Sequence, residues 1–176
     1  MKNNFLKKCK GLFLVFIAFL SMSANAQDII PRDTLIKAAR EIMMACPFCA
    51  LTTIDSTGLP QVRTMNPFPL KEEMVIWFAT GRTSRKVKDM RNNPNVCVYY
   101  ADHKNPSGYV TINGKAEVID DKELLEKMKR DYWLSNPNWK DIFVLIKITP
   151  VTMDVTNYAR GIAGDPQTSR APRVIF

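Results

Sequence analysis

A short segment, Thr-Gly-Arg-Thr-Ser-Arg-Lys at residues 80–86, carries the residue types best suited to holding an anion. It follows an apolar run at residues 74–78 and leads into a predicted helix. Ser84 is placed to cap that helix, whose first-turn N–H groups and macrodipole favour a negative charge. Arg85 and Lys86 add two cations beside those donors. The segment therefore predicts a binding site for a phosphorylated ligand.

Arg63 is a further candidate for the same site, and it lies in a predicted strand at residues 61–65. A single arginine on a strand usually faces solvent and has no special role. Together with Ser84, Arg85 and Lys86, however, Arg63 completes a set of one bidentate fork, one hydroxyl and two further cations. These are the groups that hold a phosphate. The hypothesis is that this strand and the following helix meet in the fold.

The elements that must position these residues are mostly short strands. Strand patterns occur at residues 49–55, 61–65, 74–80, 96–101, 109–119, 141–148 and 151–155, the last two forming one strand or a pair joined at Thr149-Pro150. Helical patterns occur at residues 33–45, at 84–92 and after a cap at Asp120 or Asp121, where Leu124, Leu125, Met128 and Tyr132 share a face. Consecutive strands with few helices between them favour an antiparallel β-barrel with flanking helices over a parallel doubly wound fold.

Residues 1–26 are typical of a Sec-type signal peptide. They combine a basic start (Lys2, Lys7, Lys8 and Lys10), an apolar run at residues 12–20 and a small-x-small site at Ala24-Asn25-Ala26. The run is shorter than the ~20 residues of a membrane span, although an uncleaved anchor stays an alternative. We expect export to a periplasm or the cell exterior, with no stable membrane insertion after cleavage.

The formal net charge of +8 includes the four signal lysines and falls to +4 without them. This mild excess does not indicate a nucleic-acid partner. The remaining length fits one domain at residues 27–157, followed by a tail at 158–176 that is rich in glycine, proline and arginine and is expected to be irregular. The tail either folds over the ligand site or packs on the barrel or on a second subunit.

Cys46 and Cys49 form a Cys-x-x-Cys pair, but the pair closes a predicted helix instead of opening one. No helix N-terminus is therefore available to lower a thiol pKa, and thiol exchange catalysis is not expected. A structural disulfide and two partly buried thiols both remain open. Only Cys97 and His103 could extend the pair into a metal site, and His103 is expected in a solvated hairpin loop, so no metal is predicted.

The order and spacing of four motifs resemble a known family. The motifs are Gly-x-Pro-x-Val-Arg-x-Met at residues 58–65, Thr-x-x-x-Ser-Arg-Lys within 80–86, Asn-Pro-x-Val at 93–96 and Gly-Lys-Ala at 114–116. This arrangement resembles the pyridoxamine 5′-phosphate oxidase-like FMN-binding split barrels, and it is closest to their smaller, general-stress-protein-like branch. The resemblance implies a mainly β fold, a six-stranded antiparallel split barrel that forms a homodimer with FMN at the interface.

The same resemblance implies roles for particular cofactor-binding residues. Arg63 and Lys86 would hold the FMN phosphate with Ser84 and Arg85 beside them, Thr64 and Met65 would run along the ring, and Ala79 and Thr80 would line the ribityl chain. Tyr109 stands where the family often has a glutamine near the flavin. The resemblance assigns no catalytic residue.

The sequence thus predicts an FMN-dependent oxidoreductase acting on an unknown small-molecule substrate. In such an enzyme the flavin exchanges hydride with the substrate while the protein positions it, which agrees with the absence of an evident acid–base pair. The alternative is a non-catalytic split-barrel binding or stress protein. Its cleft would hold haem, a deazaflavin or another phosphorylated ligand.

Overall fold

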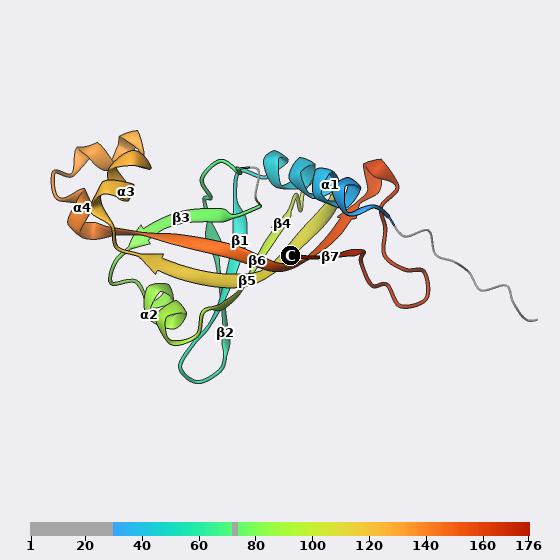
Figure 1. Ribbon diagram of the computed structural model, residues 1–176, viewed down its shortest axis with the longest axis horizontal. Helices are drawn as coiled ribbons and strands as arrows, with labels where there is room; N and C mark the ends of the chain where they lie inside the picture. Colours follow the sequence, from blue (N-terminus) through green and yellow to red (C-terminus); the bar gives the residue numbers. More distant parts are fainter. Residues whose placement is uncertain (1–29, 72–73) are drawn as a thin grey trace, which may run out of the picture.

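The computed structural model describes residues 30–71 and 74–176, so the predicted signal peptide lies outside it. The chain folds mainly into β-strands with a few short helices around them (Figure 1). The elements are α1 (Arg32–Ala45), β1 (Cys49–Ile54), β2 (Pro60–Met65), β3 (Ile76–Gly81), α2 (Arg85–Asn92), β4 (Asn95–Ala101), β5 (Gly108–Ile119), α3 (Lys122–Lys127), η1 (Asp131–Ser135), α4 (Trp139–Ile142), β6 (Phe143–Asn157), η2 (Tyr158–Arg160) and β7 (Arg173–Ile175). No helix in the described part of the chain is long and apolar enough to span a membrane.

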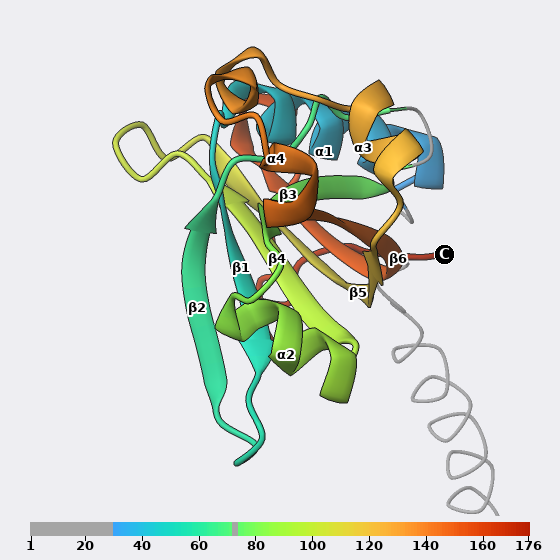
Figure 2. The same cartoon turned by 90° about the vertical axis from the view of Figure 1, so that its left-hand side faces the viewer.

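All strand pairings in this sheet are antiparallel, in the order β2-β1-β4-β5-β6-β3, with β7 added to β6. The two ends of this order, β2 and β3, do not pair, and α2 packs against β1 and β5 (Figure 2). This arrangement confirms the predicted six-stranded antiparallel split barrel. Because β2 is an edge strand, alternate backbone N–H and C=O groups along it face away from β1.

The main core fills the inside of the barrel and is closed by α1. The helix buries Leu35, Ala39, Ile42 and Met43, and Ile36 is partly buried against the same cluster. Buried residues alternate along β1 and β3, as expected for strands that show one face to a core. This alternation fixes which side chains of the two strands point into the barrel.

A second, smaller cluster packs where α3, η1 and α4 cover the outer face of β3 and β6. Its centre is Trp133, whose ring stacks on Phe143 at a centroid distance of 4.8 Å and lies 5.5 Å from Trp139. Asp121 caps α3 by accepting hydrogen bonds from two backbone N–H groups, as predicted. The predicted helical face was wrong at Tyr132, which lies beyond the end of α3 in η1 and is 67% exposed.

One long strand, β6, covers the residues predicted as one strand or a pair joined at Thr149-Pro150, so the single strand is the alternative that the structure takes. It passes through Pro150 because that residue lies opposite Gly114, where the β5–β6 register shifts and a ladder hydrogen bond is not required. A Cβ atom on Gly114 would lie 2.6 Å from the Thr149 carbonyl oxygen, so the close approach of the strands needs glycine here. The first predicted strand residues, 141–142, are instead the end of α4.

The tail is more ordered than its composition suggests. Its last residues form β7 on the edge of β6, where Arg173 donates to Asp154. Ile162 and Val174 are buried in the main core, and Arg160 pairs with Glu41 of α1. Within one chain the tail therefore packs on the barrel, as one of the predicted alternatives required.

Candidate functional site

Arg63 on β2 reaches back across β1 into the side of the barrel covered by α2. Its Nη1 donates to the Leu51 carbonyl oxygen at 3.2 Å and to the Thr53 hydroxyl at 2.8 Å. Its Nη2 lies 3.8 Å from a carboxylate oxygen of Asp89 on α2. One edge of the guanidinium is thus anchored to the protein, while the edge formed by Nε and Nη2 keeps N–H groups for a further acceptor.

Lys86, in the first turn of α2, is anchored in a similar way from a different strand. Its Nζ donates to the Thr80 hydroxyl at 2.8 Å, and the Thr80 and Ser84 oxygens are 3.5 Å apart. Thr80 is buried at the end of β3. The two predicted cations are therefore each held by a buried threonine, Arg63 by Thr53 and Lys86 by Thr80.

Ser84 stands at the N-cap of α2 with an extended backbone, but its side chain makes no capping hydrogen bond. This corrects the predicted capping role, because its hydroxyl lies beside Thr80 instead. The first turn is closed only by backbone bonds from Val87 and Lys88 to the Ser84 carbonyl oxygen. The first-turn N–H groups are left without a side-chain acceptor, which is the arrangement that suits an anion.

The electrostatics of this region are those of converging cations. Burial lowers the pKa of Lys86, and the nearby charge of Arg63 lowers it further. The pKa of Arg63 is likewise lowered by burial, raised by Asp89 and lowered again by Arg85. Arg63, Arg85 and Lys86 therefore repel one another. A bound phosphate would relieve this repulsion, so the net positive charge of the region favours an anion. The Arg63 side chain meets α2 at Asp89, as the hypothesis required.

The other predicted cofactor residues divide between the two faces of the sheet. Met65 is buried on the same face as Arg63, whereas Thr64 is exposed on the opposite face. Ala79 packs on the second, smaller cluster, which is centred on Trp133, so its side chain lies on the opposite face of β3 from that of Thr80. These positions follow from the two-residue period of a strand.

Tyr109 also lies on the outer face, where its ring is 5.9 Å from that of Tyr99. Tyr99 pairs with Ala50, and Ala50 pairs with Thr64, so the three side chains Thr64, Tyr99 and Tyr109 share this face. Within one chain Tyr109 is not brought to Arg63. Its predicted flavin contact remains a prediction for a site shared between two subunits.

Two residues of the cationic site were not anticipated, namely Thr53 and Asp89. Thr53 is fully buried, Asp89 is 4% exposed, and the Thr53 hydroxyl donates to Asp89 Oδ2 at 2.9 Å. The available signal was a polar residue at a core-facing position: Thr53 continues the buried alternation of Cys49 and Leu51, and Asp89 adjoins buried Met90. Such residues need a hydrogen-bonding partner inside the protein.

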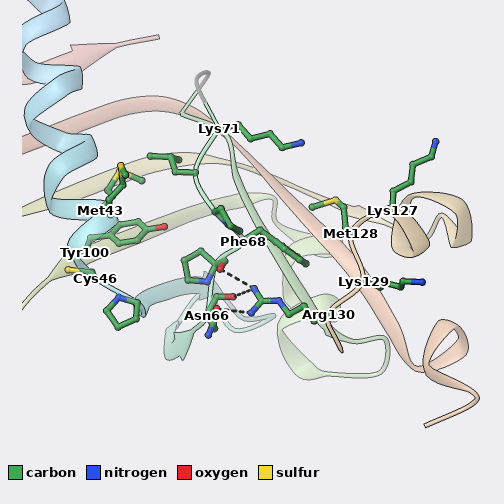
Figure 3. A pocket seen from close by; sticks show the side chains of 15 residues that line it. Met43, Cys46, Asn66, Phe68, Lys71, Tyr100, Lys127, Met128, Lys129 and Arg130 are labelled. Atoms are coloured by element: carbon green, nitrogen blue, oxygen red, sulfur yellow. Dashed lines mark hydrogen bonds between the residues drawn. The ribbon is translucent and has the colours of Figure 1, made fainter. Parts of the chain in front are cut away.

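A large cavity of about 880 Å³ lies beyond the end of β2, between the end of α1 and the end of α3 (Figure 3). Its wall is largely apolar, with Met43, Phe68, Leu70, Tyr100 and Met128 among the lining residues. Basic side chains also line the cavity, and none of the lining residues that the structure describes is acidic; the basic ones are Lys71, Lys127, Lys129 and Arg130. The cavity does not include Arg63 or Lys86, but it begins where the strand carrying Arg63 ends.

Arg130 holds one wall of this cavity in place. It donates to Asn66 Oδ1 at 2.8 Å and to the carbonyl oxygens of Asn66 and Pro67 at 3.2 and 3.0 Å, as the dashed lines in Figure 3 show. Its guanidinium carbon also lies 4.4 Å from the Phe68 ring centroid. These contacts fasten the segment after β2 to the end of α3.

The cysteines that the structure describes are free thiols, namely Cys46, Cys49 and Cys97. Cys46 ends α1 and Cys49 begins β1, as predicted, and both are buried. Burial raises the pKa of Cys49 to about 12. Among the described residues no three His, Cys, Asp or Glu side chains gather into a metal-binding group. His103 is exposed in the β4–β5 loop, and Cys97 lies on β4.

Comparison with known proteins adds a family and a fold. The sequence model described as pyridoxamine 5′-phosphate oxidase matches residues 35–157. The General Stress Protein 26 structure from Bacillus anthracis str. Sterne is 28% identical, with a TM-score of 0.55 over 68% of this chain and 91% of that chain. A Clostridium acetobutylicum protein related to general stress protein 26 is 18% identical, with a TM-score of 0.62 over 73% and 92%. An F420 Reductase is 24% identical, with a TM-score of 0.51 over 61% and 90%. No curated protein matches the chain.

Proposed function

The chain belongs to the pyridoxamine 5′-phosphate oxidase family, and from this membership we propose that it is an FMN-dependent oxidoreductase acting on a small molecule. The observation that carries the proposal is the group of cations formed by Arg63, Arg85 and Lys86. Each anchored member keeps N–H groups for a ligand, and their mutual repulsion disfavours the ligand-free state.

The residues present fit a flavin phosphate. Arg63 offers its free guanidinium edge, Lys86 a charge held by Thr80, and the first turn of α2 its unbonded N–H groups. The exposed edge of β2 adds a backbone donor and acceptor at one of the two adjoining residues Thr64 and Met65, because alternate residues of an edge strand face away from the sheet, and a planar heterocycle can use these groups. When bound there, FMN supplies hydride exchange, and the protein binds and orients it.

The layout along β2 gives this ligand a direction. Asn66, the first cavity residue after the strand, is three residues from Arg63, or about 10 Å at the rise of a β-strand. A phosphate at Arg63 therefore directs the ring along Thr64 and Met65 toward the cavity. We assign the cavity to the substrate. Its apolar part would contact Phe68 and Met128, and its polar or anionic group would contact the basic side chains of the lining.

The proposal includes a homodimer with the flavin at its interface. Supporting it, the outer face of the sheet exposes Val62 and Val151, which are 65% and 45% exposed, and Leu59 in the β1–β2 turn is 60% exposed. Tyr109 lies on the same outer face and would approach the flavin of a second copy. Light scattering of residues 27–176 tests the dimer, and a mass near that of one chain would contradict it.

Export to a periplasm or the cell exterior remains part of the proposal, resting on the pattern of residues 1–26. Cell fractionation with N-terminal sequencing tests it. The expected product begins at Gln27 in the exported fraction, and an intact chain in the cytoplasm would contradict export.

An absorption spectrum tests the cofactor. Residues 27–176 are purified, incubated separately with FMN, a phosphorylated deazaflavin and haemin, and freed of unbound ligand. Retention of FMN with one flavin per chain is the expected result. Retention of the deazaflavin alone, or a haem spectrum without flavin binding, would replace FMN by the alternative cofactor. Reduction of the bound flavin by an electron donor then tests the oxidoreductase activity.

A further inference from the structure

We propose that Thr53 and Asp89 are positioning residues that set the orientation of Arg63 for the phosphate before the ligand arrives. The inference rests on the proposed FMN site and adds two residues to it. Neither residue would touch the ligand. They act through Arg63, the one residue that both of them contact.

The direction of the hydrogen bonds is fixed by their chemistry. An ionised aspartate only accepts, so the single Thr53 hydroxyl proton points to Asp89 Oδ2 at 2.9 Å. The lone pairs of the Thr53 oxygen are then left for Arg63 Nη1, which donates at 2.8 Å. Because Thr53 is fully buried, water does not offer its hydroxyl another partner. Asp89 thus orients the Thr53 hydroxyl group so that its oxygen lone pairs face Arg63.

The guanidinium is planar, so fixing one of its edges fixes the other. Nη1 is held by both Leu51 and Thr53, and Nη2 is drawn toward Asp89 at 3.8 Å. The remaining Nε and Nη2 donors therefore take one direction without a ligand. The Arg63 side chain therefore loses its rotamer freedom before binding, so this entropy loss does not weaken the complex with FMN.

The charges that face Asp89 support a role in the site. Arg85 and Lys86 lie four and three residues before Asp89 on α2, but no ion pair joins either to Asp89 in the described structure. The hydrogen-bond partner of Asp89 is Thr53, and Arg63 lies 3.8 Å away. A buried carboxylate without a partner would be costly. Here the Asp89 carboxylate accepts a hydrogen bond from Thr53 on β1, the strand that also supports Arg63.

The test uses Thr53→Val, which keeps the side-chain shape and removes the hydroxyl, with Thr53→Ser as the matched control that keeps it. Affinities for FMN and for riboflavin are measured by fluorescence quenching. We expect Thr53→Val to weaken FMN binding roughly three- to tenfold. Riboflavin has no phosphate to meet Arg63, so its affinity should be unchanged. Thr53→Ser should keep the FMN affinity of the wild-type protein.

A second variant guards against loss of folding. Thr53→Val combined with Asp89→Leu removes both members of the Thr53–Asp89 hydrogen bond, so neither buried group is left without the other. Arg63 keeps its hydrogen bond to the Leu51 carbonyl oxygen. This double variant should show the same selective loss for FMN. Equal weakening of FMN and riboflavin, or no change in either variant, would overturn the positioning role. Failure of the wild-type protein to bind FMN would instead overturn the proposed function, and the positioning role with it.

Discussion

Replacement of Arg63 by methionine separates the binding role of this residue from its structural one. The substitution removes the guanidinium that would hold the phosphate, and it also removes the cation nearest to Asp89. Two effects are therefore expected in one variant, a loss of FMN affinity and a loss of stability. Combining Arg63→Met with Asp89→Asn removes the unpaired carboxylate and should restore stability without restoring binding.

The affinity loss follows from the donors that Arg63 keeps free. Two charge-assisted hydrogen bonds from Nε and Nη2 are worth about 1.5–3 kcal/mol each, so FMN should bind roughly 10²- to 10⁴-fold more weakly. The stability loss follows from Asp89, which is 4% exposed. Orphaning a fully buried charge costs about 3–5 kcal/mol. The 3.8 Å separation and the 18% exposure of the Arg63 side chain reduce this to about 1–2 kcal/mol.

Flavin fluorescence titration and thermal melting measure the two effects. A stability loss of that size lowers Tm by roughly 2–8 °C in a domain of this length. The double variant should melt within a degree or two of wild type, by the same conversion. Unchanged FMN affinity in Arg63→Met would refute the phosphate assignment. Restored affinity in the double variant would refute the view that Arg63 itself holds the phosphate.

Three further outcomes follow from the structure. Burial and then Arg63 lower the pKa of Lys86, and bound phosphate would raise it, so FMN affinity should fall as pH rises through that lowered pKa. Titrations at a series of pH values up to the ordinary lysine range should show this fall, and Lys86→Met should flatten it. Gly114→Val should lower Tm by roughly 3–10 °C, because its Cβ would lie 2.6 Å from a backbone oxygen; an unchanged melting curve would contradict the close approach. Cys49, with a pKa raised to about 12, should resist a thiol reagent at pH 8 until the protein is unfolded, as mass spectrometry of labelled peptides would show.

The sequence predicted the parts of the fold that depend on local pattern. The strand patterns of β1 and β3, the helical pattern of α1 and the cap at Asp120 or Asp121 all depend on local chemistry. The structure confirms them, with Asp121 as the cap. The convergence of Arg63 with Lys86 depends on tertiary contacts. It was a hypothesis from the residue types alone, and the four motifs that resemble a family supported it. A single motif would not have placed the Arg63 side chain beside α2.

What the sequence missed depended on pairing across the sheet. Pro150 normally interrupts a strand, and only its pairing with Gly114 at a register shift lets β6 continue through it. Thr53 is an ordinary strand residue until Asp89 is packed against it. The tail strand β7 lacks a strong pattern of its own and forms because the edge of β6 offers it backbone partners.

The most direct test of the account compares FMN with riboflavin by calorimetric titration of residues 27–176. The two ligands share the ring and the ribityl chain and differ only in the phosphate that Arg63 and Lys86 would hold. If Arg63 and Lys86 hold the phosphate, one FMN should bind per chain, with a preference over riboflavin of roughly a hundredfold or more. Equal affinity for the two ligands, or no binding of FMN, would contradict it.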